Sequence, residues 1–234
     1  MQTMRSIAAM HDAIHGGNRH TTHLQAALDA IRESKDFNGT FGTIDQSALQ
    51  RMVAVHKTVV LKEHDLENLS AIEASEAYLA VARDNLVAAS GGAREASNAL
   101  VIIGKVERQL ATMNNAHASA VAMTMQDAAV QIAPYSVFAH YELGVTLSEQ
   151  GLVHQAADSL KQSVSLRPTR RSYQKLLQFS RQCGDIDTVQ SCLAALKSDQ
   201  LQTDIPVQLI SPERFAATNR LASASYASDG RQSQ

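Results

Sequence analysis

Four histidines near the start of the chain have the spacing that comes closest to a chemical site. His11 and His15 are four residues apart, so on a helix both imidazoles share one face, and His20 and His23 follow closely. Four imidazoles can hold Zn²⁺. Asp12 stands where a zinc protease helix requires its general-base glutamate, and no further ligand is identified. One hypothesis is a metal-binding protein or enzyme that uses these four histidines; the other is a histidine-rich leader without a role.

Other catalytic arrangements are not found in the sequence. There is no glycine-rich phosphate loop, no nucleophile elbow and no paired-cysteine motif. Cys183 and Cys192 flank the Gly184-Asp185 turn, where they can serve as a redox pair or as small core residues. We therefore expect a protein that is not an enzyme and that needs no cofactor.

Charge and composition exclude further classes. The chain has 234 residues, 21 Lys and Arg against 23 Asp and Glu, and two Cys. A net charge of −2 argues against binding to nucleic acid, which favours a basic excess. The longest apolar runs, such as 99–103, are far below the roughly 20 residues that a membrane span needs. With so few cysteines, we expect a cytoplasmic protein without membrane insertion.

The elements that must position any site are predicted to be helices. Ala is the best helix former, the chain has 36 of them, and the first Pro is Pro134. Capping-box spacing marks two helix starts, at Thr22 with Gln25 and at Ser70 with Glu73. The pattern predicts helices over 22–35, 46–61, 70–89, 94–115, 117–133, 137–150, 153–166, 170–183 and 186–198.

A repeat becomes visible when Pro134 is aligned with Pro168, 34 residues later. If Val137 is position 1, Gly144 falls at position 8, Gly151 at 15 and Ala156 at 20. We expect Gly144 and Ala156 to be small because two antiparallel helices cross closest there, and Gly151 to form the turn. This code resembles the tetratricopeptide repeat (TPR), from which it departs at His140, where the family prefers Trp, and at Ser163, where it prefers Ala.

Neighbouring segments carry weaker copies. Tyr173, Leu176 and Val189 match positions 4, 7 and 20 of a degenerate following unit, and Ile103-Gly104 matches positions 7 and 8 of a preceding one, which has about six residues added near 113–119. The resemblance implies an all-α fold of helix–turn–helix units in a right-handed superhelix. We expect a TPR array at 94–199, with units 97–136, 137–169 and 170–203. It is preceded by a leader at 1–21, ordered or flexible, and by a helical segment at 22–93 that can hold a degenerate repeat pair. A capping segment at 204–221 and a disordered tail at 222–234 follow.

Three strings are also similar to those of bacterial multi-repeat TPR proteins: 55–62, 100–106 and 207–215. That group implies no catalytic residues, and some of its members are associated with the cell envelope, which gives an alternative to the cytoplasm. The apolar run 207–210 is expected to lie back over the last helix pair.

The resemblance also implies a concave groove lined by the first helix of each unit. The candidate partner-binding residues are Lys105, Arg108, Phe138, Tyr141, Glu142, Glu149, Arg171, Gln174, Lys175, Gln178 and Arg181. Such a groove is basic at both ends, with an aromatic and acidic middle. Val101 and Val145 stand where the TPR group that clamps a C-terminal carboxylate needs polar residues, so binding of chaperone tails is not expected.

These residues favour a scaffold or adaptor that binds a protein or peptide. Carboxylates of the partner would meet Arg171, Lys175 and Arg181, and an apolar side chain would meet Phe138 and Tyr141. The alternative is a self-assembling structural protein, in which these charges are a solvated face and the partner is a second copy.

Overall fold

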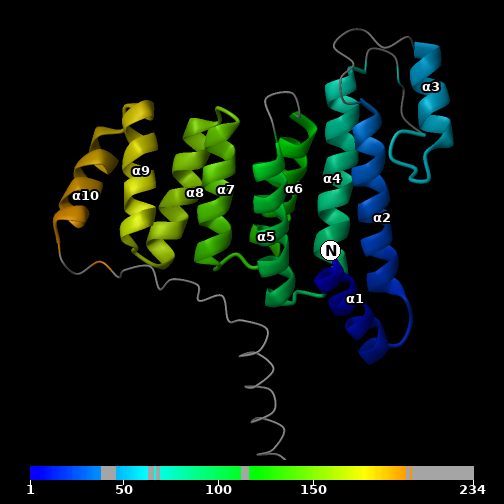
Figure 1. Cartoon of the computed structure of the whole chain (residues 1–234), viewed down its shortest axis with the longest axis horizontal. Coiled ribbons are helices and arrows are strands. Elements are labelled where there is room, and N and C mark those ends of the chain that lie inside the picture. Colours follow the sequence, from blue (N-terminus) through cyan, green and yellow to red (C-terminus); the bar gives the residue numbers. More distant parts are fainter. Residues whose placement is uncertain (38–45, 63–65, 67–68, 112–115, 199–200, 202–234) are drawn as a thin grey trace, which may run out of the picture. The chain divides into compact units, whose positions relative to one another are not determined.

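The computed structural model describes residues 1–37, 46–62, 66, 69–111, 116–198 and 201. Over these residues the fold is all-α (Figure 1). The elements are α1 (Gln2–His15), α2 (Arg19–Ser34), a 3-10 turn (Lys35–Phe37), α3 (Gln46–Val55), α4 (Ala71–Ala89), α5 (Arg94–Leu110), α6 (Ala116–Ile132), α7 (Val137–Glu149), α8 (Val153–Leu166), α9 (Arg170–Cys183) and α10 (Ile186–Lys197). None of the described helices combines the length and hydropathy needed to cross a membrane.

Helices α2 to α10 correspond to the nine predicted segments, but three boundaries are wrong. α5 ends at Leu110 rather than near 115, where Ala111 takes an extended backbone conformation. α3 ends at Val55 rather than near 61, because the backbone N–H groups of Lys57 and Thr58 donate to the carboxylate of Glu33 instead of continuing the helix. α2 begins at Arg19, so Thr22 is not its cap. The capping box at Ser70 and Glu73 is confirmed.

The histidine-rich leader is ordered. Met4, Ile7 and Ala8 lie on one face of α1 and are buried in an apolar cluster with residues of α2, α4, α5 and α6. This helical spacing was present in the sequence, where it was obscured by the polar residues around it. α1 ends where Gly16 takes a positive φ of 72°.

Asp12 of α1 takes over the capping of α2. Its carboxylate accepts hydrogen bonds from the backbone N–H of His20 at 2.8 Å and of Thr21 at 2.9 Å, and from the Thr21 hydroxyl at 2.7 Å. Burial acts to raise the pKa of Asp12, but the hydrogen bonds donated by Thr21 and His20 outweigh it and hold the pKa below its usual value.

This cap makes the α1–α2 corner sensitive to acid. A carboxylate whose pKa is lower in the folded state contributes stability above its unfolded pKa of about 4, and that contribution disappears as the pH falls through the folded pKa. We expect Asp12→Ala to lower the thermal midpoint at pH 7, and the difference from the wild type to shrink below about pH 4. Asp158→Ala, at an exposed position of α8, is the control; a pH-independent difference for Asp12→Ala would contradict the capping role.

The compact unit Met1–Gln202 is built from helix pairs. α2 packs on α4, α5 on α6, α7 on α8 and α9 on α10, and the pairs stand in a row (Figure 1). From α5 onward each pair contacts the next through α6 with α7 and α8 with α9. The α2/α4 pair joins the row differently, because α4 contacts the next pair through its second helix, α6, rather than through its first, α5. The segments 204–221 and 222–234, including the run 207–210, lie outside the described residues, as do 112–115 within the expected insertion.

Two glycines lie at close crossings within helix pairs, Gly144 between α7 and α8 and Gly104 between α5 and α6. A Cβ atom on Gly144 would lie 2.8 Å from Leu160 Cγ and 3.1 Å from the backbone oxygen of Ala156. One on Gly104 would lie 2.9 Å from Gln126 Cγ and 3.0 Å from the backbone oxygen of Ala122. The small-residue requirement predicted for Gly144 is therefore confirmed, and Gly104 shows the same requirement in the preceding pair. Ala156 is fully buried, as a residue at such a crossing would be.

Apolar residues form three clusters. One joins α1, α2 and α4 to α5 and α6, a second lies between α2, α3 and α4, and a third joins α7 and α8 to α9 and α10. Ser163, a departure from the TPR pattern, is accommodated because its hydroxyl donates to the backbone oxygen of Val137 at 3.1 Å.

Candidate functional site

The predicted groove residues lie on α5, α7 and α9, but four of them bind one another. The side chain of Glu142 is 1% exposed, and its carboxylate accepts hydrogen bonds from Lys105 Nζ at 3.2 Å and Arg108 Nη2 at 3.0 Å. Nη1 of Arg108 lies 2.7 Å from Glu149 Oε1. Two cations and two carboxylates therefore neutralise each other between α5 and α7. The expectation of an acidic middle that a partner can reach is wrong for Glu142, because the groups of α5 already cover it.

Tyr141 is also unavailable to a partner, because it is buried and holds Arg171 in position. Its ring is buried, its hydroxyl accepts a hydrogen bond from Arg171 Nε at 2.9 Å, and the guanidinium lies 4.7 Å from the ring centroid. This contact orients Arg171, which itself stays exposed. Phe138, one turn earlier on α7, remains 40% exposed and can still meet a partner.

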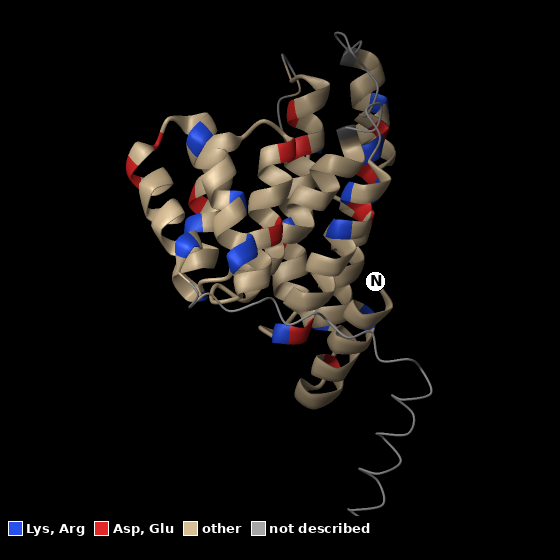
Figure 2. Ribbon diagram, turned by 60° about the vertical axis from the view of Figure 1, so that its left-hand side comes forward, with Lys and Arg blue, Asp and Glu red and all other residues tan. Residues whose placement is uncertain are grey.

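The solvent-exposed side of α9 carries basic residues. The helix contains Arg170, Arg171, Lys175 and Arg181 and no acidic residue. Arg171, Gln174, Gln178 and Arg181 are exposed, and Lys175 is half-buried with its Nζ 5.8 Å from the Phe179 ring centroid. Figure 2 shows that Lys and Arg elsewhere are interleaved with Asp and Glu along the helices. Among the helices that carry the candidate groove residues, α9 therefore offers cations without an acidic residue of its own.

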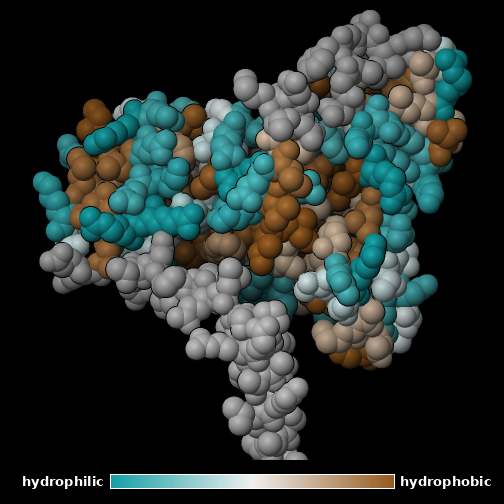
Figure 3. Space-filling model, in the orientation of Figure 1, coloured by the Kyte–Doolittle hydropathy of each residue, from teal (hydrophilic) through white to brown (hydrophobic). Residues whose placement is uncertain are grey.

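Sequence reasoning missed an apolar stripe on α5. Ile102, Val106 and Leu110 are 57%, 48% and 63% exposed, and their spacing of four places them along one side of the helix. Brown apolar side chains run down the middle of the face in Figure 3, in the region that α5 and α6 occupy in Figure 1. Only Ile102 falls at a groove position of the repeat, so the repeat code alone did not identify Val106 and Leu110.

The histidine hypothesis is only partly matched by the structure. The rings of His11, His15 and His20 lie together, with centroids 5.0 to 6.4 Å apart. His23 is directed elsewhere, with Nδ1 2.8 Å from Asn85 Oδ1. The predicted convergence of four ligands is therefore wrong. In the part of the chain that the structure describes, no three His, Cys, Asp or Glu side chains are arranged to hold a metal ion.

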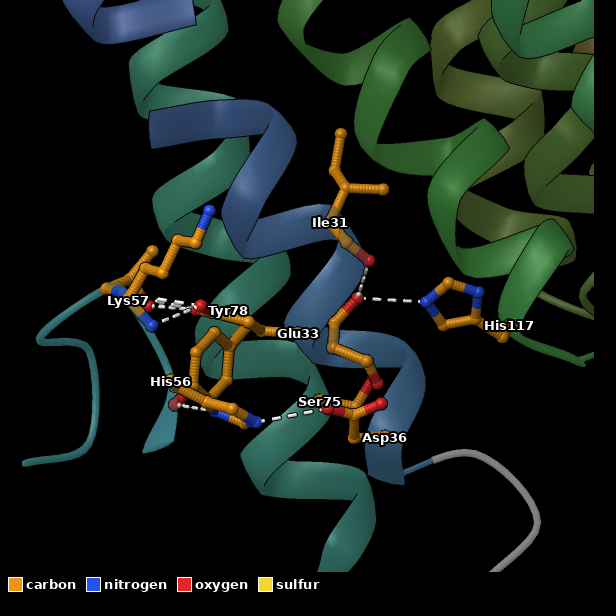
Figure 4. Close-up of polar contacts among 10 residues, drawn as sticks. Ile31, Glu33, Asp36, His56, Lys57, Ser75, Tyr78 and His117 are labelled. Carbon is orange, nitrogen blue, oxygen red and sulfur yellow. Dashed lines mark hydrogen bonds and ion pairs between the residues drawn. The ribbon is translucent and has the colours of Figure 1, made fainter. Parts of the chain in front are cut away.

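A buried polar network fastens the chain that follows α3 (Figure 4). His56 Nδ1 lies 2.7 Å from the Tyr78 hydroxyl, and its Nε2 lies 3.2 Å from Asp36 Oδ2. Burial, together with the negative charges of Glu33 and Asp36, raises the pKa of Tyr78 to about 12 despite an opposing hydrogen bond with Thr58. The phenol is thus neutral at physiological pH.

A chain of Tyr, His and Asp side chains is an arrangement that can transfer protons, but here two of its three members, Tyr78 and His56, are buried. Only Asp36, whose side chain is 55% exposed, reaches the surface. Glu33 binds the backbone N–H groups of Lys57 and Thr58, so the polar atoms are used to hold the segment after α3 against α2 and α4. Ser34 similarly lies 2.9 Å from His117 Nε2, which ties α2 to α6. We assign these contacts to stability.

The two cysteines are free thiols in the apolar cluster of the last helices. Cys192 is buried, and this burial raises the pKa of its thiol. A buried, protonated thiol is a poor nucleophile, so Cys192 fits the role of a small core residue better than that of a redox group.

No protein-family model matches the chain, and a search of curated proteins finds no relative. The open residues on α5, α7 and α9 are therefore the basis on which a function can be inferred.

Proposed function

We propose that the chain is a protein-interaction scaffold whose segment 94–199 is a TPR-type array with α5, α7 and α9 as the inner helices of successive units. The matched close crossings at Gly104 and Gly144 support the repeat. The observation that carries the binding function is the exposed apolar stripe of Ile102, Val106 and Leu110. Contiguous apolar patches of this kind mark interaction sites in proteins that remain in water.

The chemistry of the partner follows from what the inner helices leave open. The stripe on α5 and the half-exposed ring of Phe138 fit apolar side chains. Arg171, Lys175 and Arg181 fit carboxylates, since α9 offers them no internal acidic partner. Glu142 and the groups around it hold α7 in place and take no part in binding. We propose a peptide segment that is apolar at one end and acidic at the other, bound in the cytoplasm or, through the partner, at the cell envelope.

The test is a quantitative pull-down with the full chain as bait, read by mass spectrometry. We expect the triple variant Arg171→Glu, Lys175→Glu and Arg181→Glu to lose at least about tenfold of the captured partner, because each carboxylate contact becomes a repulsion. Circular dichroism should be unchanged, since none of the three side chains belongs to the buried core of the helix pairs.

The matched control reverses three exposed cations outside the groove: Arg5, Arg19 and Arg94. It carries the same change in net charge and should keep the partner. Equal loss in both triple variants would show that capture depends on net charge alone, and the groove proposal would then fail.

Self-assembly is the second candidate, because two copies of the α5 stripe could pair through the same apolar residues. It predicts a mass in light scattering that rises with concentration and falls to that of the monomer in Val106→Glu. The α9 triple variant would leave this mass unchanged.

A further inference from the structure

A second surface, separate from all the proposed groove residues, lies where α4 joins the row of helices. An open pocket of about 450 Å³ is lined by residues of α4, α6, α7 and α8, and none of the groove residues lines it. Its volume falls within the range of ligand-binding pockets. It lies where α4, which packs on α2, also meets α6, with Leu143 and Leu147 of α7 and Gln155 of α8 along the remaining side.

α4 and α6 each line the pocket with one helical face, and the two faces have the same residue spacing. α4 contributes residues 76, 79, 80 and 83, and α6 contributes residues 120, 123, 124 and 127, which is the same i, i+3, i+4, i+7 spacing on both. Arg83 Nη1 lies 3.4 Å from Asp127 Oδ2, so the later ends of the two faces meet and the helices run in the same direction. Each face covers about 10 Å of helix, or two turns.

The floor of this groove is apolar. Leu79 and Leu147 are buried, and Met123 and Leu143 are partly buried. Leu143 and Leu147 are four residues apart on α7, so they extend the apolar surface along one line. Two neighbouring helices with such a floor form the kind of groove that takes the apolar face of a third helix.

The charged residues at the rim of the pocket determine which charge a bound segment should carry. Arg83 is already engaged by Asp84 at 2.9 Å and by Asp127. Glu76, at the opposite end, is exposed and has no hydrogen bond or ion pair with any described residue. The lining therefore holds two carboxylates against one guanidinium, with the unbalanced negative charge at Glu76.

We propose that this α4–α6 groove binds a short amphipathic helix of a partner protein, with two apolar residues at i and i+4 and a Lys or Arg within one turn of them. The apolar pair fills the pocket over Met123 and Leu143. The cation pairs with Glu76. The site is distinct from the groove on α5 and α9, so the chain would hold two partner segments at once.

The experiment selects helix-constrained peptides from a displayed library against the full chain, then measures the best binder by calorimetry. We expect the selected sequences to share the apolar pair and the cation. Ala80→Trp fills the groove from its rim without emptying the core, and should weaken binding at least tenfold. Glu76→Lys should change the selected charge from Lys or Arg to Asp or Glu.

Two controls separate this proposal from the others. Asp187→Lys, an exposed change of equal charge on α10, should leave the selection unaltered. The α9 triple variant should also keep the peptide, so loss of the first proposed function and loss of this one are distinguishable. Thermal unfolding of Ala80→Trp verifies that the fold is retained.

Several results would overturn the proposal. No enriched peptide, a consensus without helical spacing, or a peptide that still binds to Ala80→Trp would each do so. A dimer that dissociates in Ala80→Trp would show instead that a second copy of the chain occupies the groove.

Discussion

Replacing Glu142 by alanine is expected to cost about 2–3 kcal/mol of unfolding free energy, because Arg108 and Lys105 both lose their buried acceptor. The cost stays below that of a fully uncompensated buried charge, since Arg108 keeps Glu149 at 2.7 Å and Lys105 is 36% exposed. For a domain of this size, such a change corresponds to a fall of roughly 4–12 °C in the thermal midpoint. Chemical denaturation of the full chain measures it.

Glu149→Ala is the matched control for Glu142→Ala. It removes a carboxylate that contacts the same Arg108, at 2.7 Å, but is 49% exposed. An exposed pair contributes at most about 1 kcal/mol. Equal effects of the two changes would mean that Glu142 is not held in a water-excluded site, and the assignment of these charges to internal stability would be wrong.

Gly144→Leu is expected to destabilise the chain by about 3 kcal/mol or more, at the upper end of what overpacking costs. The first added atom would meet Leu160 Cγ at 2.8 Å and a backbone oxygen at 3.1 Å, and the backbone of α8 cannot yield without separating the α7/α8 pair. Leucine is otherwise a better helix former than glycine by close to 1 kcal/mol, so any measured loss understates the clash.

His154→Leu, at an exposed position of α8, controls for the added apolar surface and should be nearly neutral. Gly104→Leu is the second test, because the same close approach occurs between α5 and α6. If Gly144→Leu were as stable as the wild type, the helices could not cross closely at Gly144, and the main support for a repeated unit would be lost.

Local sequence signals were sufficient for most of the helices and for the crossing at Gly144. The capping box at Ser70 and the turn at Gly151 act within a few residues, which is why they were visible. The end of α3 was not, because it depends on Glu33, more than 20 residues away in the chain. The cap of α2 likewise comes from Asp12, on a different helix.

The helices that carry the candidate groove residues could be predicted, but the pairing of their charges could not. The repeat code assigned these residues to segments that form α5, α7 and α9, and a list of charges cannot say which of them pair across helices. Glu142 looked available because its partners, Lys105 and Arg108, stand more than 30 residues earlier. The α4–α6 groove was missed for a similar reason: it depends on how α4 joins the row, which no single segment encodes.

The paired charges between α5 and α7 have a consequence for how the helices are aligned. Apolar surfaces can slide past one another at little cost, whereas Glu142 and Arg108 match only at one offset between the two helices. Thr146 adds a second such contact, since its hydroxyl donates a hydrogen bond of 2.7 Å to Oε1 of Gln126, a fully buried residue on α6. These polar contacts lie at the junction of the first and third apolar clusters, so they set the offset along the helix axes at which α7 packs against α5 and α6.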